Sequence, residues 1–223
     1  RGAVCGLLAA ALFGVSAPIA KRLLGETTPQ VLAGLLYLGA GVGLWLYRRA
    51  RPTRGEARLR REDVPRLLGV TVAGGVVGPV LMLFGLERVS AITGSLLLNL
   101  EAPFTIAVAV VVFREHLGRH AGGAIALILA GAAILKVEPG SVGADTPGVL
   151  LLAGACLAWA IDNNLTQTLS LRDPFAVVRA KALGAGAFNL AIGLVLAGGQ
   201  LPGAGVVATA LALGCVSYGV SVV

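Results

Sequence analysis

Long apolar stretches separated by polar segments dominate the chain. Eight of them approach the roughly 20 apolar residues that a transmembrane helix needs: 3–20, 29–47, 67–86, 91–113, 121–137, 147–169, 175–198 and an eighth that begins near 206 and is cut at 223. Most of the polar segments are short, which favours antiparallel neighbours in a bundle. The pattern predicts an all-α, polytopic membrane helix bundle.

Three of the predicted helices have a recognisable start. Thr28-Pro29, Asp145-Thr146-Pro147 and Asp173-Pro174 each combine a side chain that can cap a helix with a proline in the first helical turn. We therefore expect capped helices that begin at these three places.

The composition agrees with a membrane protein. Of the 223 residues, 57% are apolar and only 13% are charged, whereas soluble domains carry about 25% charged residues. The 32 glycines have no collagen period. Small residues let membrane helices approach closely, which is the expected role of Gly39 with Gly43 and of the cluster Gly74, Gly75 and Gly78. These features exclude a disordered chain, a disulfide scaffold and an ordinary cytosolic enzyme.

The net charge of +7 is concentrated in one loop. Between Arg48 and Arg66 the chain has eight arginines and three acidic residues, so this segment carries +5. It has no basic face with interleaved aromatic residues, and nucleic acid is therefore not an expected partner. If successive loops alternate between the two sides of a membrane, fourteen basic residues lie on the side of this loop and four on the other. The positive-inside rule then predicts that this loop and the N-terminus are cytoplasmic. The expected location is the plasma membrane, as a multi-pass protein of a bacterial inner membrane.

A weak internal repeat relates the two halves of the chain. A shift of 145 residues aligns Pro29 with Pro174 and the run Gly39-Ala40-Gly41 with Gly184-Ala185-Gly186. The shift spans five predicted helices, an odd number, so the two halves should have opposite orientations in the membrane. Inverted repeats are typical of secondary transporters. We expect a first repeat over 1–138 and a second over 145–223 that is truncated in its third helix.

Two segments resemble the EamA domain of the drug/metabolite transporter superfamily. Residues 85–135 are similar to the end of such a domain: they contain the run Ala-Ile-Thr-Gly-Ser-Leu-Leu-Leu-Asn-Leu-Glu-Ala-Pro, an Arg-Glu turn and a Gly-rich closing helix. Residues 157–190 are similar to the opening of a second domain. The resemblance implies ten helices in two inverted repeats of five, and transport of small metabolites, often export.

Glu101 is the first candidate site residue, because a charged group within hydrocarbon is costly and usually faces a cavity or a partner. It lies near the middle of the fourth span, on a helical face that it shares with Gly94 and Thr105. Pro103 follows and is expected to kink the helix. Glu101 either binds substrate or takes up a proton in a cavity, or it is a structural carboxylic acid that bonds to a neighbouring helix.

A polar stripe on the sixth span supplies further candidates. Trp159, Asp162, Asn163 and Thr166 fall at i, i+3, i+4 and i+7, so they share one face of an otherwise apolar helix. The stripe either lines a substrate cavity or forms polar contacts between helices. Lys181 lies at a similar depth in the seventh span and is expected to form an ion pair with Asp162.

The family resemblance adds residues from other helices. It implies that the first, third, fourth, sixth and eighth helices line the cavity, which makes Ser16 and Tyr218 candidates for substrate binding. Asn99 lies on a different face from Glu101 and is expected to be a packing contact.

No catalytic, cofactor or metal site is expected. His116 and His120 have helical spacing for a metal, but two ligands with basic neighbours are a weak signal, and an interfacial turn is the preferred interpretation. Cys5, Cys156 and Cys215 lie in separate apolar spans and are expected to be small packing residues.

The sequence therefore predicts a secondary transporter, not an enzyme, that exports a small polar metabolite across the plasma membrane by alternating access. A non-transporting membrane assembly subunit and a membrane-embedded lipid-modifying enzyme are the alternatives. The expected partners are a small-molecule substrate and the lipid bilayer. Protons are a candidate coupling ion, and a second copy of the chain is a candidate partner.

Overall fold

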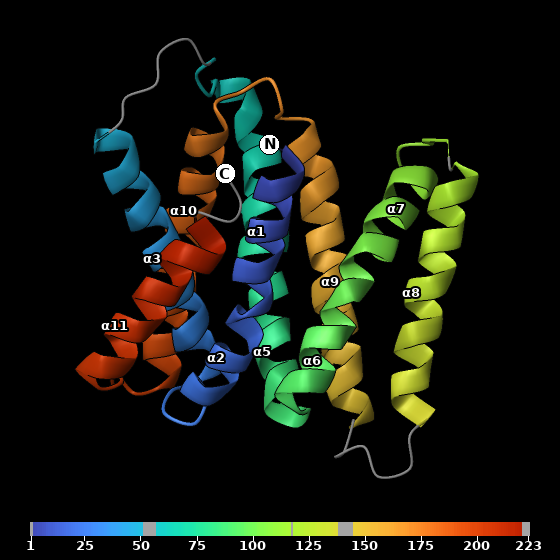
Figure 1. Ribbon diagram of the computed structural model, residues 1–223. Helices are drawn as coiled ribbons and strands as arrows, with labels where there is room; N and C mark the ends of the chain where they lie inside the picture. Colours follow the sequence, from blue (N-terminus) through green and yellow to red (C-terminus); the bar gives the residue numbers. More distant parts are fainter. Residues whose placement is uncertain (1, 51–56, 117, 138–144, 220–223) are drawn as a thin grey trace.

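The computed structural model describes residues 2–50, 57–116, 118–137 and 145–219. Within these ranges every regular element is helical, which confirms the all-α prediction (Figure 1). The elements are α1 (Gly2–Gly14), α2 (Ser16–Leu23), α3 (Pro29–Ala50), η1 (Arg61–Asp63), α4 (Val64–Val70), η2 (Thr71–Val77), α5 (Gly78–Arg88), α6 (Ala91–Leu97), η3 (Leu98–Leu100), α7 (Glu101–Val111), α8 (Arg119–Val137), α9 (Thr146–Gln167), α10 (Pro174–Leu196), α11 (Ala204–Leu213) and η4 (Gly214–Gly219). The short elements η1 and η3 are 3₁₀ turns, whereas η2 and η4 are π-helical.

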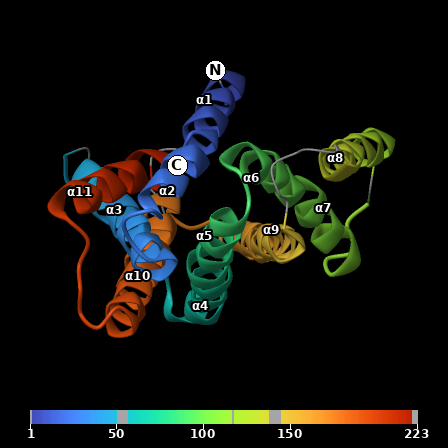
Figure 2. The same ribbon diagram turned by 90° about the horizontal axis from the view of Figure 1, so that it is seen from below.

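Several of these elements join end to end into membrane spans. In the described part of the chain, six helical segments are long and apolar enough to cross a membrane: Gly6–Leu23, Pro29–Ala50, Arg61–Arg88, Ala91–Val111, Thr146–Gln167 and Pro174–Leu196. The other two predicted spans coincide with α8 and with α11 and η4, whose apolar stretches are shorter, Gly122–Gly131 and Ala204–Gly219. The chain is a multi-pass membrane protein. Helix α8 lies at the edge of the bundle beside α6 and α7 (Figure 2).

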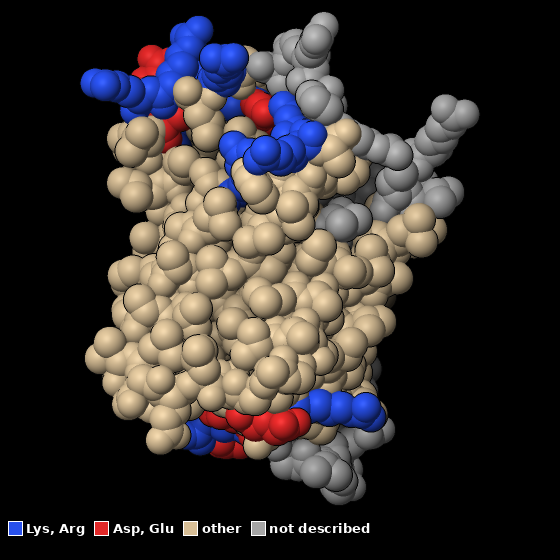
Figure 3. Space-filling model, turned by 90° about the vertical axis from the view of Figure 1, so that its left-hand side faces the viewer, with Lys and Arg blue, Asp and Glu red and all other residues tan. Residues whose placement is uncertain are grey.

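Charged side chains gather at the two ends of the bundle, with an uncharged belt between them on the face that Figure 3 shows. Residues 57–63 and the turn between α9 and α10 lie at one end (Figure 1). The amide of Asp173 donates to the carbonyl of Ala57 at 2.9 Å, and Arg172 Nε lies 2.8 Å from Asp63 Oδ2. The turns between α2 and α3 and between α10 and α11 lie at the opposite end. We call the first the arginine-rich end.

The side of the membrane that the arginine-rich end faces can be tested by cysteine labelling. We expect a single cysteine at Gln200, at the opposite end, to react with an impermeant maleimide added to intact cells. A single cysteine at Arg61 should react only after permeabilisation, because the positive-inside rule places this end in the cytoplasm. The three native cysteines are replaced by alanine in both variants. Efficient labelling of Arg61→Cys from outside would reverse the predicted orientation.

Two of the three predicted helix caps form. Asp173 Oδ1 accepts from the amide of Ala176 at 3.2 Å at the start of α10, and Thr28 Oγ1 accepts weakly from Val31 at 3.4 Å at the start of α3. The expected cap at Asp145 is wrong, because its side chain makes no capping hydrogen bond. Asp145 forms an ion pair with Arg88 at 2.9 Å instead.

The fourth span is broken close to Pro103, as expected. Proline has no N–H and cannot bond to the carbonyl four residues earlier, which is that of Asn99. Residues Leu98–Leu100 form the 3₁₀ turn η3, and α7 begins at Glu101. The break therefore places Glu101 in the first turn of a new helix, midway through the span.

Glycines allow α3 to pack against helices of the second half of the chain. A Cβ atom at Gly34 would lie 2.5 Å from the backbone nitrogen of Leu190 on α10. Gly39 and Gly43 lie against α11 and η4, with similarly little space for a side chain. The predicted close helix packing at Gly39 and Gly43 is thus confirmed. Helix α3 packs against α10 as well as against α11 and η4.

The bounds of the elements follow the 145-residue shift. Helix α3 begins at Pro29 and α10 at Pro174, and the two helices run in opposite directions in Figure 1. The third span of each half contains a π-helical segment, and residue 71, where η2 begins, falls inside η4 when shifted by 145. The division into repeats over 1–138 and 145–223, and the superposition of 3–78 on 148–223 about an axis in the membrane plane, stay predictions.

Candidate functional site

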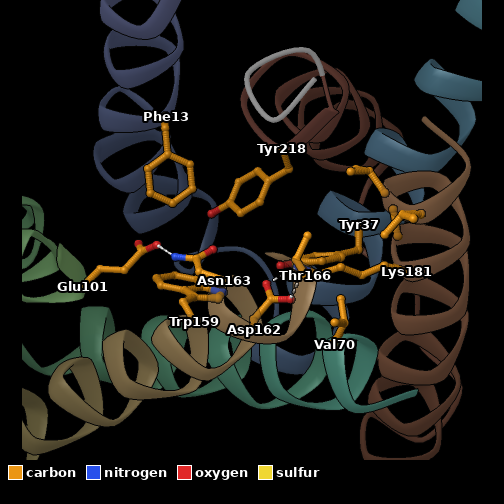
Figure 4. Close-up of a pocket in the computed structure, with 13 residues that line it drawn as sticks. Phe13, Tyr37, Val70, Glu101, Trp159, Asp162, Asn163, Thr166, Lys181 and Tyr218 are labelled. Carbon is orange, nitrogen blue, oxygen red and sulfur yellow. Dashed lines mark hydrogen bonds and ion pairs between the residues drawn. The ribbon is translucent and has the colours of Figure 1, made fainter. Parts of the chain in front are cut away.

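Most of the predicted site residues meet around one cavity inside the bundle. This central cavity has a volume of about 150 Å³ and is bordered by α1, α3, α4, α7, α9, α10 and η4 (Figure 4). The predicted residues on its wall are Glu101, Trp159, Asp162, Asn163, Thr166, Lys181 and Tyr218. Thr105 lines an adjoining cavity instead. Ser16 is fully buried and lines neither of the two cavities itself, but its side chain interacts with that of Tyr218 on the wall of the central cavity.

Asp162 and Lys181 form the predicted ion pair. The Oδ2 atom of Asp162, on α9, contacts Nζ of Lys181, on α10. Thr166 Oγ1, one helical turn further on, donates to Asp162 Oδ1 at 3.2 Å. The Asp162 side chain is 5% exposed and that of Lys181 15%. Each charge therefore neutralises the other in a place where either alone would be costly.

Glu101 lies on the wall between the central cavity and a second one. Asn163 Nδ2 donates to Glu101 Oε1 at 2.7 Å (Figure 4). The second cavity, the side cavity, has a volume of about 550 Å³ and is bordered mainly by α1, η3 and α7. Phe13, Glu101 and Asn163 line both cavities. No ion pair joins Glu101 to a basic residue in the described ranges, so the direct partner of its carboxylate there is the amide of Asn163.

The carbonyl of Gly74 orients two aromatic rings of the central cavity. The amide of Gly78, directly after η2, donates to the carbonyl of Ala73, five residues back. The next bond of this pattern would run from Pro79 to Gly74, but Pro79 has no N–H. The Gly74 oxygen therefore accepts from side chains: the hydroxyl of Tyr37 donates at 2.5 Å and Trp159 Nε1 at 3.0 Å. π-Helical turns of this kind are frequent at functional sites.

Gly74 also leaves the space that the Asp162 carboxylate occupies, since a Cβ atom at position 74 would collide with Asp162 Oδ2. We expect Gly74→Ala to lower the free energy of unfolding by about 1–3 kcal/mol, which is typical of overpacking. Gly123→Ala is the matched control, because its Cβ would meet nothing within 4 Å and both changes raise helix propensity alike. Unfolding in detergent measures the difference. Equal stability of the two variants would contradict this account of Gly74.

Sequence reasoning missed two aromatic residues of the cavity wall, Phe13 and Tyr37. The ring of Phe13 lies 5.5 Å from that of Tyr218 and 6.0 Å from that of Trp159, and the ring of Tyr37 lies 5.7 Å from that of Tyr218. A lone aromatic residue in an apolar span carries no signal. Pro79 after a glycine-rich run was the available clue, because it leaves backbone carbonyls that need side-chain donors.

The remaining candidates lie away from the central cavity. Asn99 Nδ2 donates to the carbonyl of Leu96 at 3.0 Å in its own helix and borders the side cavity. His116 is exposed in the turn before α8. Cys156 is buried in the core and Cys215 is partly buried, which fits their expected packing role. The side chains of Cys5 and His120 lie outside the described part.

Comparisons with known proteins agree on the kind of protein. The model of the EamA-like transporter family matches residues 1–137. An "uncharacterized transporter" of Methanothermobacter thermautotrophicus is 28% identical over 212 residues, which cover 88% of this chain and 62% of the relative. The chain thus spans about three fifths of the length of that relative. A solved crystal structure superposes on 98% of this chain and 76% of its own with a TM-score of 0.72, and its 16% identity shows a common fold alone.

The family match covers more than half of the chain and includes the segment around Glu101. The helical membrane bundle, the fold shared with a solved structure and the transporter relative all agree with it. The chain belongs to the EamA-like transporter family.

Proposed function

We propose that the protein is a secondary transporter that exports a small polar metabolite with an amine group across the plasma membrane by alternating access. The observation that carries this proposal is the position of Glu101 on the wall that the central and side cavities share. A carboxylate there contacts a solute in either cavity, and it has an amide partner, Asn163, rather than a basic one.

The charges on the wall favour a cationic group on the substrate. Asp162 and Lys181 neutralise each other, so the ionised form of Glu101 gives the wall a net charge of −1. Four aromatic rings border the same cavity: Phe13, Tyr37, Trp159 and Tyr218. The faces of aromatic rings attract ammonium groups, and their area suits an apolar substrate body.

The arrangement of the halves supports alternating access as the mechanism. The 145-residue shift matches helices that run in opposite directions, α3 and α10. In transporters built from inverted repeats, rocking of one half against the other opens a midplane site to alternate sides. Lys181 and Asp162 come from the second half and Glu101 from the first, so such a movement changes the site. Glu101 takes up a proton in this scheme when the amine leaves.

The two alternatives predict different features. A lipid-modifying enzyme needs acidic residues and histidines clustered near an interface, and no cluster of three or more metal-binding side chains occurs among the described residues. A non-transporting subunit has no use for a buried charge pair beside a cavity. These observations favour transport over both.

Flux measurements on the full-length protein in liposomes test the proposal. We expect saturable, protein-dependent movement of amines or amino acids and little movement of neutral sugars. Protein-free liposomes and liposomes with a heat-inactivated sample are the controls. Absence of flux for every amine, amino acid, nucleoside and sugar of a broad panel would contradict transport, and flux of sugars alone would contradict the role of Glu101.

A further inference from the structure

A third cavity lies at the arginine-rich end, between α3, α10 and the segment before η1. It has a volume of about 390 Å³ and takes its charged wall from Arg48, Arg58, Arg179 and Asp173. We call it the arginine cavity. It is separate from the central cavity, and the two have no lining residue in common. Figure 3 shows basic side chains gathered at this end of the bundle, above the uncharged belt.

Both oxygens of the Asp173 carboxylate in the arginine cavity already have partners within the protein. Asp173 Oδ1 caps α10 by accepting from Ala176, and Asp173 Oδ2 lies 2.6 Å from Arg48 Nη2. Its side chain is 14% exposed and that of Arg48 20%. The guanidinium of Arg48 also lies 5.3 Å from the centre of the Phe175 ring, which fixes its position on the wall.

Two cations of the wall have no such partner. No ion pair or hydrogen bond joins the side chains of Arg58 or Arg179 to any residue in the described ranges. With Asp173 neutralised by Arg48, these two arginines give the described wall of the arginine cavity a net charge of +2. Two guanidinium groups around one hollow suit a doubly charged or multidentate oxyanion, because each presents a planar fork of N–H donors.

The surroundings of the arginine cavity suit a ligand at a membrane surface. Its apolar wall includes Leu44 and Phe175, and the ring of Phe175 stacks on that of Tyr47 at 5.6 Å with an angle of 8°. Trp45, which lies on α3 with Leu44 and Tyr47, is 44% exposed. Aromatic residues of this kind are enriched at the level of the lipid headgroups, and basic pockets between membrane helices bind the headgroups of anionic lipids.

We propose that the arginine cavity binds a phosphate group, with Arg58 and Arg179 as its ligands. Two sources share this chemistry: the headgroup of an anionic phospholipid and a soluble phosphate. The site does not depend on the transport function, since none of its residues lines the central cavity. Bound phosphate would link the segment before η1 to α10, because Arg58 and Arg179 come from these two places.

Thermal unfolding of the full chain in neutral detergent tests the site, since a ligand that binds only the folded state raises the unfolding temperature. The probes are phosphatidylglycerol, phosphatidylcholine as the neutral lipid, and inorganic phosphate. We expect phosphatidylglycerol or inorganic phosphate to stabilise the wild type, and phosphatidylcholine to have no effect. Stabilisation by phosphatidylglycerol alone identifies a lipid site, and stabilisation by inorganic phosphate identifies a site for soluble phosphate.

Variants then locate the binding. Arg58→Gln and Arg179→Gln should each weaken the apparent affinity about fivefold, as expected for one arginine beside a phosphate group. Arg61→Gln removes the same charge from an exposed position outside the cavity and should change it little. The variants should unfold at the wild-type temperature without ligand, because neither arginine has a described partner. Equal stabilisation of the wild type and the double variant, or no stabilisation of the wild type by either probe, would overturn the proposal.

Discussion

Replacing Glu101 with Gln is expected to abolish pH-dependent transport while the protein stays folded in the membrane. Gln keeps the size of the side chain and an acceptor for Asn163 Nδ2, which lies 2.7 Å from the Glu101 carboxylate. It removes the negative charge that would bind an amine. A hydrogen bond to a charged group contributes roughly 1.5–3 kcal/mol, so transport should fall at least about tenfold. Flux of an amine substrate into or out of liposomes measures the loss.

The protonation of Glu101 determines the direction in which substrate affinity changes with pH. As the pH falls, Glu101 of the wild type takes up a proton and loses its attraction for an ammonium group, so substrate affinity should decrease. The Gln variant should bind weakly at every pH, with no titration. Glu87→Gln is the matched control, because Glu87 is exposed at the end of α5 and lines neither the central nor the side cavity. Wild-type flux and a wild-type pH profile in Glu101→Gln would show that Glu101 is structural.

Hydropathy, proline positions and glycine patterns predicted most of the fold, because each reflects a local requirement. Eight apolar stretches gave the positions of the helices, and Pro29 and Pro174 marked two helix starts. The failed cap at Asp145 shows the limit of local patterns. Asp145 bonds to Arg88, which lies 57 positions away, and a sequence pattern cannot weigh a local acceptor against a distant cation.

Site residues that share one face of a single helix could be predicted from their spacing. Site residues that are placed by contacts between helices could not. The spacing of Trp159, Asp162 and Thr166 placed them on one face, and similar depth sufficed to pair Asp162 with Lys181. Ser16 came from a family expectation about whole helices, which does not tell whether a residue lines the cavity itself or, as Ser16 does, lies behind a lining residue such as Tyr218. Tyr37 donates to the carbonyl of Gly74, which Pro79 leaves without a backbone donor, and only the three-dimensional arrangement of α3 and η2 reveals that contact.

The helix break before Glu101 connects fold and site. Pro103 predicts a break, but the direction in which the two half-helices point depends on their neighbours. In the structure α7 packs along α9, and Asn164 Nδ2 donates to the carbonyl of Thr105 at 3.0 Å across this contact. The contact holds the first turn of α7 beside the polar stripe of α9. Glu101 therefore reaches Asn163 because of a packing interaction that no single helix encodes.

Removing one partner of the Asp162–Lys181 ion pair is expected to cost more unfolding free energy than half of what the removal of both partners costs. Asp162→Asn leaves a buried ammonium group without a counter-charge, and Lys181→Met leaves a buried carboxylate. Loss of one partner of a buried pair costs about 3–5 kcal/mol. The double variant keeps neither charge, so its loss of unfolding free energy should be smaller than the sum of the two single losses by at least about 1 kcal/mol.

A double-mutant cycle on the free energy of unfolding measures this coupling. The control cycle uses Arg88→Met and Asp145→Asn, a pair at the opposite end whose side chains are 52% and 38% exposed. Exposed pairs of this kind contribute about 0–1 kcal/mol, so the control cycle should be nearly additive. Thr166→Val removes only a 3.2 Å hydrogen bond to Asp162. Its loss of unfolding free energy should therefore be smaller than that of Asp162→Asn or Lys181→Met and larger than that of either control change. Additivity in the Asp162–Lys181 cycle would mean that the two charges are solvated independently, and the central cavity would then carry two separate charges rather than one neutral pair.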